Sequence, residues 1–211
     1  MTKVKELEDL IISSCNLHNT DETRKKVQEY INLSLTAAED IIFLHYQNYL
    51  KSKTSVDTVD GKYLDYPKDC YDTKVLKIIG EGQEAIKFEH LDGKIHLPQE
   101  VNPPLEITYI RKAKRIEIKN APEYLDFSDD INFLMDSEDK PETLDLPIAL
   151  EFIKIHTQFL VYVNNYDMFK VDRYGPLVQR AEEMLVSKLF DLAPPKQHKE
   201  TTATEYYERF L

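Results

Sequence analysis

The spacing of the hydrophobic residues changes twice along this chain, and the change constrains the fold more than any other feature. From residue 3 to about 50, and again from 147 to 192, apolar residues recur every three or four positions, as on one face of a helix. Between about 54 and 118 they alternate with polar residues, as in strands with one covered face. We therefore expect an α+β fold, with a small antiparallel β-sheet inserted between a long N-terminal helix and two closing helices.

Four helices are predicted, over residues 3–14, 21–50, 147–165 and 171–192. Thr20 can cap the second helix, which would be about 45 Å long. The third helix is apolar most of the way round, so we expect it at the centre of the core. Gly175-Pro176 either starts or kinks the fourth helix. The expected buried face of the third helix consists of Ile148, Phe152, Ile155, Phe159, Val163 and Tyr166.

Strands are expected on both sides of two short turns. Residues 72–79 and 84–90 flank the turn Gly-Glu-Gly-Gln, and a second turn, Asp92-Gly93, leads into residues 94–98. A further strand covers 105–113, and an extra strand follows at 115–119. These loop lengths predict antiparallel pairing.

Residues 123–145, called the acidic segment from here on, carry most of the charge. They hold nine Asp or Glu and one Lys, a formal charge of −8 within a total of −11. The acidic residues are interleaved with large apolar ones, as in segments that become ordered on contact with a partner. The spacing does not match a twelve-residue calcium loop, and the central glycine is missing. The predicted docking residues are Asp126, Phe127, Asp129, Asp130 and Phe133.

The last part of the chain has no core-facing period. We divide the sequence into a folded domain, 1–192, and an extended C-terminal arm, 193–211. Such an arm is either a frayed terminus or a tail whose aromatic residues anchor it to a partner. The predicted anchors, together with the prolines that stop the last helix, are Pro194, Pro195, Tyr206, Tyr207 and Phe210.

No motif for nucleophilic catalysis, phosphate binding or zinc binding is present, so we predict no catalytic, cofactor or metal site. His90 and His96 flank a turn, but two imidazoles do not make a metal site without further ligands. His45 and His156 are expected in the core. Cys15 and the second cysteine, Cys70, are expected as idle thiols in a reducing compartment. The sequence also shows no signal peptide and no apolar run of membrane-spanning length.

One enzymatic alternative remains open. Restriction-type nucleases place Glu-x-Lys on a strand, where the carboxylate holds a metal ion and the lysine faces the phosphate. Glu117 and Lys119 fit this pattern, with Asp72 or Asp92 as the second ligand. Alternating Glu and Lys on the wet face of a strand produces the same triplet without any catalytic role.

The net charge of −11 argues against a protein that grips nucleic-acid phosphates, because such binding needs a cationic surface. A negative wall would instead let DNA slide past without sticking. A second open alternative is a cytosolic protein that binds a basic partner through the acidic segment.

The order of the motifs resembles the head-to-tail connector (adaptor, or head-completion) proteins of short-tailed bacteriophages and their relatives. The resemblance covers about residues 21–192, and the acidic segment and the strand 115–119 depart from the family pattern. It rests on Ile31-Asn32 and His45-Tyr46 with Tyr49 in the long helix, an extended arm Tyr63-Leu64-Asp65-Tyr66-Pro67, Val75 to Ile79, Ile95-x-Leu97-Pro98, Pro104-Leu105-x-Ile107-x-Tyr109, Arg111 and Leu146-Pro147.

The resemblance implies a structural, non-enzymatic virion protein. Its copies, usually twelve, would form a homo-oligomeric ring between the portal protein and the tail, after synthesis in the host cytoplasm. The arm 193–211 would wrap the portal, and the sheet would face the tail or further ring proteins. The pair of strands around residues 95–98 and 105–109 would close the sheet. Genomic DNA would pass through the ring without specific binding and without any contact with a membrane.

Overall fold

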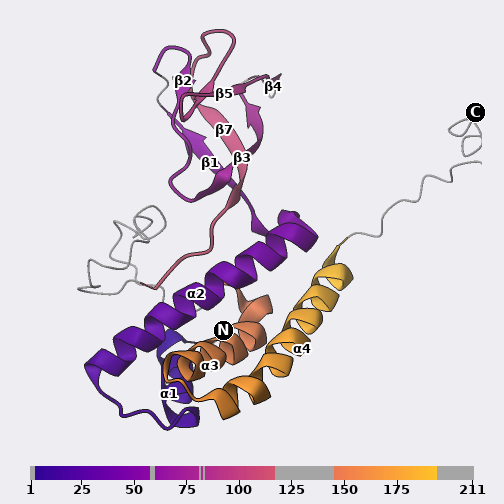
Figure 1. Ribbon diagram of the computed structural model, residues 1–211. Helices are drawn as coiled ribbons and strands as arrows, with labels where there is room; N and C mark the ends of the chain where they lie inside the picture. The colour runs from indigo at the N-terminus through magenta and orange to yellow at the C-terminus, as the bar shows by residue number, and fades with distance from the viewer. Residues whose placement is uncertain (1–2, 58–59, 81, 83, 117–144, 194–211) are drawn as a thin grey trace, which may run out of the picture.

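The predicted α+β class is confirmed by the computed structural model, which describes residues 3–57, 60–80, 82, 84–116 and 145–193. Figure 1 shows a layer of helices with a β unit standing on it, close to the end of α2. The helices are α1 (Val4–Ser14), α2 (Asp21–Tyr46), α3 (Leu150–Asn164) and α4 (Met168–Leu192), with short 3₁₀ turns η1 (Gln47–Leu50) and η2 (Pro147–Ala149).

Helix α2 begins where the sequence predicts. The Thr20 hydroxyl accepts a hydrogen bond from the Thr23 amide at 3.2 Å, which satisfies one of the unpaired donors of the first turn. The α-helix ends at Tyr46, and the 3₁₀ turn η1 continues from there into the first strand. The prediction that His45 lies in the core is wrong, because its side chain is exposed and only its edge contacts Phe190. The buried face is formed by Val27, Ile31, Ser34, Leu35, Ala38, Glu39 and Ile42.

Helix α3 lies at the centre of the helical unit, in contact with α1, α2 and α4, as expected. The face of α3 that is buried is rotated about the helix axis relative to the predicted one. Val163 and Tyr166 are 43% and 87% exposed, whereas the polar Thr157 is fully buried. Thr157 can be buried because it has a polar partner in the core: its hydroxyl lies 2.9 Å from the Ser34 hydroxyl of α2. The buried face consists of Phe152, Ile153, Thr157, Gln158, Val161 and Tyr162.

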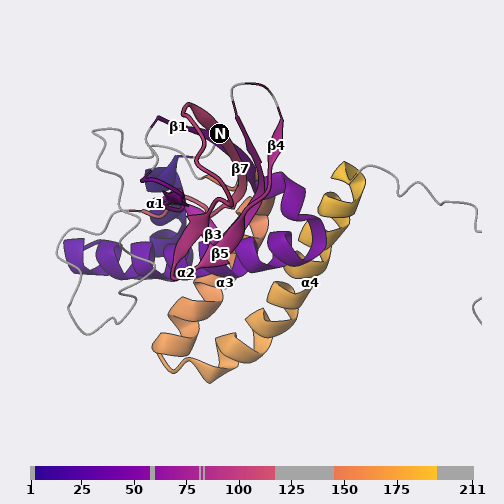
Figure 2. The same ribbon diagram turned by 90° about the horizontal axis from the view of Figure 1, so that it is seen from above.

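Helix α4 begins at Met168, three residues earlier than predicted. The Asp167 carboxylate caps it by accepting a hydrogen bond from the Lys170 amide at 3.2 Å. Gly175-Pro176 therefore does not start the helix, and Pro176 lies inside it. In Figure 2, α4 runs along the edge of the helical layer beside α3. Its buried residues are Ala181, Leu185 and Leu189.

The β unit contains two antiparallel sheets where the sequence predicted one. The sheets have strand orders β1-β7-β3-β4 and β2-β6-β5. They share a core in which Ile78, Leu97 and Leu105 are fully buried. The strands are β1 (Lys51–Val56), β2 (Tyr63–Leu64), β3 (Cys70–Ile79), β4 (Ala85–Ile86), β5 (Glu89–Leu91), β6 (Lys94–His96) and β7 (Leu105–Arg111).

Two expectations about the β unit need correction. The runs around Ile95 and Ile107 do not pair with each other: Ile95 belongs to β6 and Ile107 to β7, in different sheets. Both residues are fully buried in the shared core, so the alternation correctly marked the covered faces. Residues 115–116 of the expected strand 115–119 are not in a strand, and 117–119 lie outside the described residues.

Candidate assembly surfaces

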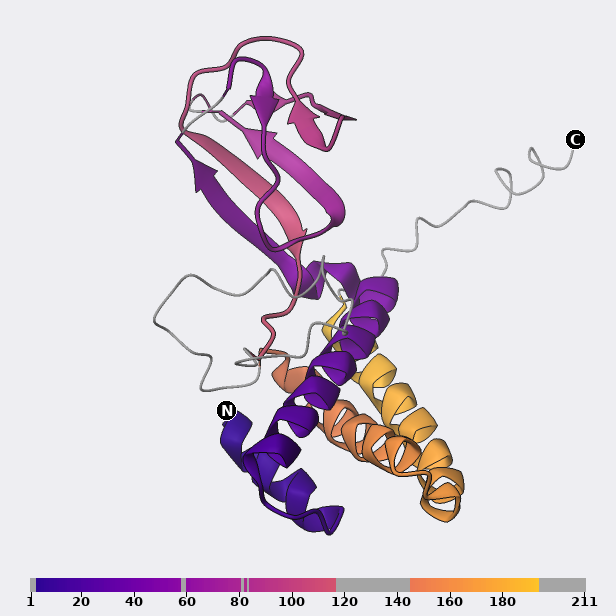
Figure 3. The ribbon, with the colours of Figure 1, turned by 60° about the vertical axis from the view of Figure 1, so that its left-hand side comes forward.

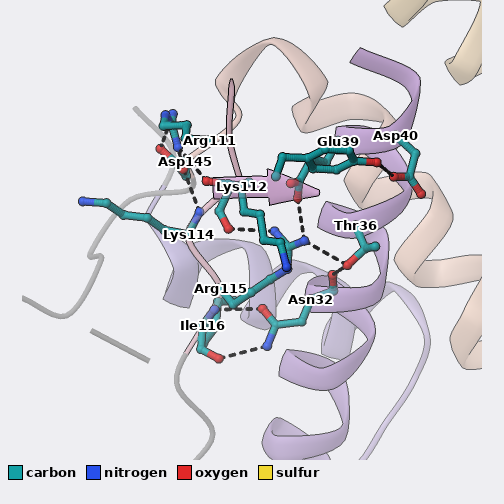
Figure 4. A network of polar contacts seen from close by, with 12 residues as sticks. Asn32, Thr36, Glu39, Asp40, Arg111, Lys112, Lys114, Arg115, Ile116 and Asp145 are labelled. Atoms are coloured by element: carbon teal, nitrogen blue, oxygen red, sulfur yellow. Dashed lines mark hydrogen bonds and ion pairs between the residues drawn. The ribbon is translucent and has the colours of Figure 1, made fainter. Parts of the chain in front are cut away.

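A network of hydrogen bonds and ion pairs forms the junction that joins the β unit to α2 (Figure 4). After β7 the chain runs along one flank of α2. There the Asn32 amide donates to the Ile116 carbonyl at 2.9 Å, and its oxygen accepts from the Ile116 amide at 2.8 Å. One side chain thus satisfies both backbone groups of a residue that has no strand partner.

A buried ion pair reinforces this contact. The Arg115 guanidinium lies 2.5 Å from one carboxylate oxygen of Glu39 and donates to the Thr36 hydroxyl at 3.0 Å. Glu39 is 1% exposed, and its other oxygen, Oε1, has no hydrogen-bond partner among the described residues. Burial raises the pKa of Glu39, while the adjacent Arg115 lowers it. Burial is the larger of the two effects, so the pKa of Glu39 is raised overall.

A second ion pair brings together the two sides of the gap from 117 to 144. The Arg111 guanidinium contacts both carboxylate oxygens of Asp145, at 2.5 and 3.2 Å, and the Lys114 amide donates to the same carboxylate at 2.8 Å. Both partners are mostly buried. Asp145 is the last residue of the acidic segment, so its position at this clamp fixes where the segment rejoins the helical unit.

A stacked aromatic pair completes the junction. The Tyr71 ring of β3 stacks on Phe43 of α2 with 4.6 Å between ring centroids, and its hydroxyl donates to Asp40 at 2.7 Å. Burial, and next the hydrogen bond to the anionic Asp40, raise the pKa of Tyr71. Because contacts to Asn32, Glu39, Asp40 and Phe43 recur along one flank of α2, the β unit is held to this helix at several points.

Two groups of large apolar side chains remain uncovered. The turn between α3 and α4 exposes Val163, Tyr166, Met168 and Phe169, with Phe169 79% exposed. At the other end of α4, Phe190 and Leu192 lie exposed, and the nearby end of α2 exposes Leu44. A shallow hollow of about 420 Å³ opens there, lined by residues 43–48. Clusters of this kind on a protein surface usually mark a contact with another macromolecule.

The predicted site residues lie outside the described residues. This holds for Pro194, Pro195, Tyr206, Tyr207 and Phe210 of the arm, for Asp126, Phe127, Asp129, Asp130 and Phe133 of the acidic segment, and for Glu117 and Lys119 of the nuclease alternative. The two candidate partners of that alternative are exposed and belong to different sheets of the β unit. Asp72 lies in β3, and Asp92 lies in the turn between β5 and β6 of the other sheet.

The histidines of the β unit are not opposite each other. His96 pairs with Glu89 across the strands and packs against Tyr63, and His90 lies 2.5 Å from the Tyr66 hydroxyl. Within the described ranges, no group of three or more His, Cys, Asp or Glu residues is arranged to hold a metal ion. His156 is half-buried and bonded to the Ser34 hydroxyl at 3.0 Å, in line with the expected core role.

The sequence named Asn32 and Arg111 only as positions of the family resemblance, and the junction itself was not predicted. Asn32 and Glu39 follow Ile31 and Ala38 in the apolar stripe of α2, so their polar character at the edge of that stripe was the available signal.

None of the helices that the structure describes is both long enough and apolar enough to cross a membrane. Comparison of the chain with protein-family models and with curated proteins finds no match.

Proposed function

We propose that the chain is a structural virion protein of a tailed bacteriophage, a subunit of the ring adaptor that joins the portal to the tail and extends the DNA channel. The order of described elements supports this proposal: a long helix, a small β unit and two closing helices. The expected arm, residues 63–67, begins as strand β2 of the β unit and does not stand apart from it. The motifs of the resemblance fall on these elements in sequence, with Ile31-Asn32 on α2, Tyr63 on β2 and Val75 on β3.

One observation carries the proposal: the helical unit exposes large apolar residues at both ends of α4. Tyr166 and Phe169 stand at one end, and Phe190 and Leu192 at the other. A subunit that works alone gains nothing from uncovered aromatic rings, whereas a subunit of a ring covers them against neighbours. Contacts that are weak singly become strong when they repeat around a closed ring.

The charge supports a channel role. Twelve copies at −11 each give a ring of about −130 before counterions. DNA would not be bound by such a ring, because release of counterions from its phosphates requires cationic contacts. In this proposal the arm 193–211 attaches to the portal, and the β unit faces the tail or a further ring protein.

The test is a truncation that ends at residue 192, compared with the full chain. Leu192 is the last residue of α4, so the truncated chain keeps every described helix and strand and should keep its circular dichroism spectrum and melting temperature. It should lose capture by the portal protein of the same genome. Portal capture of the truncated chain at the full-chain level would overturn the assigned role of the arm.

A further inference from the structure

One flank of α4 carries a stripe in which basic and apolar residues alternate. The spacing of four, three, four and four residues places them on the same side of the helix, over a length of about 22 Å. All five side chains are exposed, Leu177 to 40% and Met184 to 47%. The residues of this stripe, called the α4 stripe, are Arg173, Leu177, Arg180, Met184 and Lys188.

The cations of the α4 stripe are unpaired among the described residues, although Glu183 and Asp191 lie three positions beyond Arg180 and Lys188. Arg173, Arg180 and Lys188 make no ion pair with any residue that the structure describes. By contrast, Arg24 and Arg115 are both paired with carboxylates. Exposed cations beside exposed apolar side chains make a surface suited to a partner that is both acidic and apolar.

The α4 stripe faces away from α2. Lys170, one turn before Arg173 on the same flank, lies 4.7 Å from the centre of the Tyr162 ring of α3. Phe190, on the opposite flank of α4, contacts His45 of α2 instead. The two flanks therefore meet different helices, and the flank that bears the stripe is turned from α2.

The acidic segment has the complementary composition, and the described residues on either side of 117–144 are held on the other side of α2. Ile116 is held by Asn32, and Asp145 by Arg111. Figures 1 and 3 place residues 112–116 and α4 on opposite sides of α2. The 28 positions from 117 to 144 both leave and return at this junction. A chain that must return to its base reaches at most about 45 Å outward, half its extended length.

We propose that the acidic segment of one copy binds the α4 stripe of the next copy. Residues 123–144, without the paired Asp145, carry a formal charge of −7 with interleaved apolar residues, and this charge meets three unpaired cations around Leu177 and Met184. Because Ile116 and Asp145, the described residues on either side of 117–144, lie across α2 from the stripe, a contact between copies joins two different surfaces of the subunit. Such head-to-tail contacts close into rings or extend into filaments. The inference deepens the proposed function by naming the surfaces that join neighbouring subunits.

Zero-length cross-linking of carboxylates to lysine amines tests the contact directly, since Lys188 is the lysine of the stripe. Full-length protein labelled with ¹⁴N and with ¹⁵N is mixed, both at high concentration and on portal rings. We expect cross-links from Lys188 to Asp126, Asp129 or Asp130 that join light and heavy peptides. Cross-links confined to peptides of one isotope place the contact within one chain and overturn the proposal, as does their absence under both conditions.

Charge reversal supplies the second test. The stripe variant is Arg173→Glu, Arg180→Glu and Lys188→Glu, and the segment variant is Asp126→Lys, Asp129→Lys and Asp130→Lys. Each alone should lower the yield of mixed cross-linked dimers by about tenfold, because every lost exposed pair weakens association by about two- to fivefold. Glutaraldehyde replaces the zero-length reagent here, because the reactive groups are changed.

A mixture of the two variants should recover association, because the reversed stripe then faces the reversed segment. A matched control, Lys5→Glu, Lys74→Glu and Lys87→Glu, changes the net charge equally at exposed positions away from the stripe and should associate normally. Failure of the mixture to recover, or equal loss in the control, overturns the proposal. The proposal is also overturned if the stripe variant loses binding to duplex DNA while association between copies is unchanged.

The two proposals fail in different ways. Copies that cross-link through Lys188 but never attach to the portal contradict the adaptor function and leave this contact standing. Normal rings of the stripe variant on the portal contradict this contact and leave the adaptor function standing.

Discussion

Replacing Arg115 with methionine tests whether burial makes the Arg115–Glu39 ion pair important for the stability of the fold. The substitution keeps the length and apolar stem of the side chain but removes the cation that lies 2.5 Å from the Glu39 carboxylate. Glu39 is 1% exposed, so its charge would be left buried and unpaired. Such a loss destabilises a protein by about 3–5 kcal/mol, which for a chain of this length lowers the melting temperature by about 6–20 °C.

A second ion pair serves as a control that separates the effect of burial on stability from the effect of the distance between the charges. Lys53 lies 2.7 Å from Glu106, almost as close, but the two side chains are 61% and 43% exposed. Lys53→Met should cost about 1 kcal/mol at most, because solvent screens the pair and the free carboxylate stays hydrated. If the distance between charges decided the energy, the two variants would lose similar stability.

The pH dependence of Arg115→Met follows from Glu39. Burial already raises the pKa of this carboxyl group, and loss of Arg115 raises the pKa further. When the pKa of a carboxyl group is higher in the folded than in the unfolded state, protonation of that group stabilises the fold. The ionised group therefore destabilises the fold fully at high pH, and this destabilisation disappears as the pH falls toward the pKa of the unfolded state. The deficit relative to wild type should therefore shrink between pH 8 and pH 5.

Urea unfolding followed by circular dichroism, at several pH values, measures both effects. Glu39→Gln combined with Arg115→Met should lose most of this added pH dependence, because the buried carboxyl group of the junction pair is then gone. A loss below about 1 kcal/mol in Arg115→Met at pH 8, or a deficit that does not change with pH, would refute the reasoning.

Three further outcomes are expected. Asn32→Leu removes both hydrogen bonds to Ile116 and should cost about 1–3 kcal/mol in urea unfolding, with Asn32→Asp intermediate because it keeps the acceptor; an unchanged midpoint would contradict this. Tyr71→Phe keeps the stack on Phe43 but loses the hydrogen bond to Asp40, so it should lower the free energy of unfolding by about 1 kcal/mol. Phe43→Ala removes the stack and should lower it by more. A larger loss in Tyr71→Phe than in Phe43→Ala would contradict this order. Burial raises the pKa of Cys15 and raises that of Cys70 to about 11. Both thiols should therefore react slowly with a thiol reagent at pH 8 and quickly in urea. Rapid reaction of the folded chain would show that the thiols are accessible.

The change of spacing along the sequence was enough to predict the fold class and most element positions. Pro147 begins a short helical turn and Leu192 ends α4, as predicted, because proline and the end of an apolar stripe are local signals. The phase of α3 was not predictable. Its residues are apolar on several faces, and the polar partners that bury Thr157 and Gln158 are Ser34 and Ser14, which are 123 and 144 positions away in the chain.

The arrangement of strands shows the same limit. Alternation correctly identified Ile95, Leu97, Leu105 and Ile107 as inward-facing, since it reports which face of a strand is covered. It carries no information on which strand lies alongside, and so two facing sheets were predicted as one. The junction was likewise hidden, because Glu39 and Arg115 are 76 positions apart and each reads alone as an ordinary charged surface residue.

The most direct test of the central claim is an electron-microscopy image of portal rings mixed with the full-length protein. We expect a second ring of density on one end of the portal, formed by copies of this chain, and its loss when the chain is truncated at residue 192. Bare portals at saturating concentrations of correctly folded protein would contradict the account.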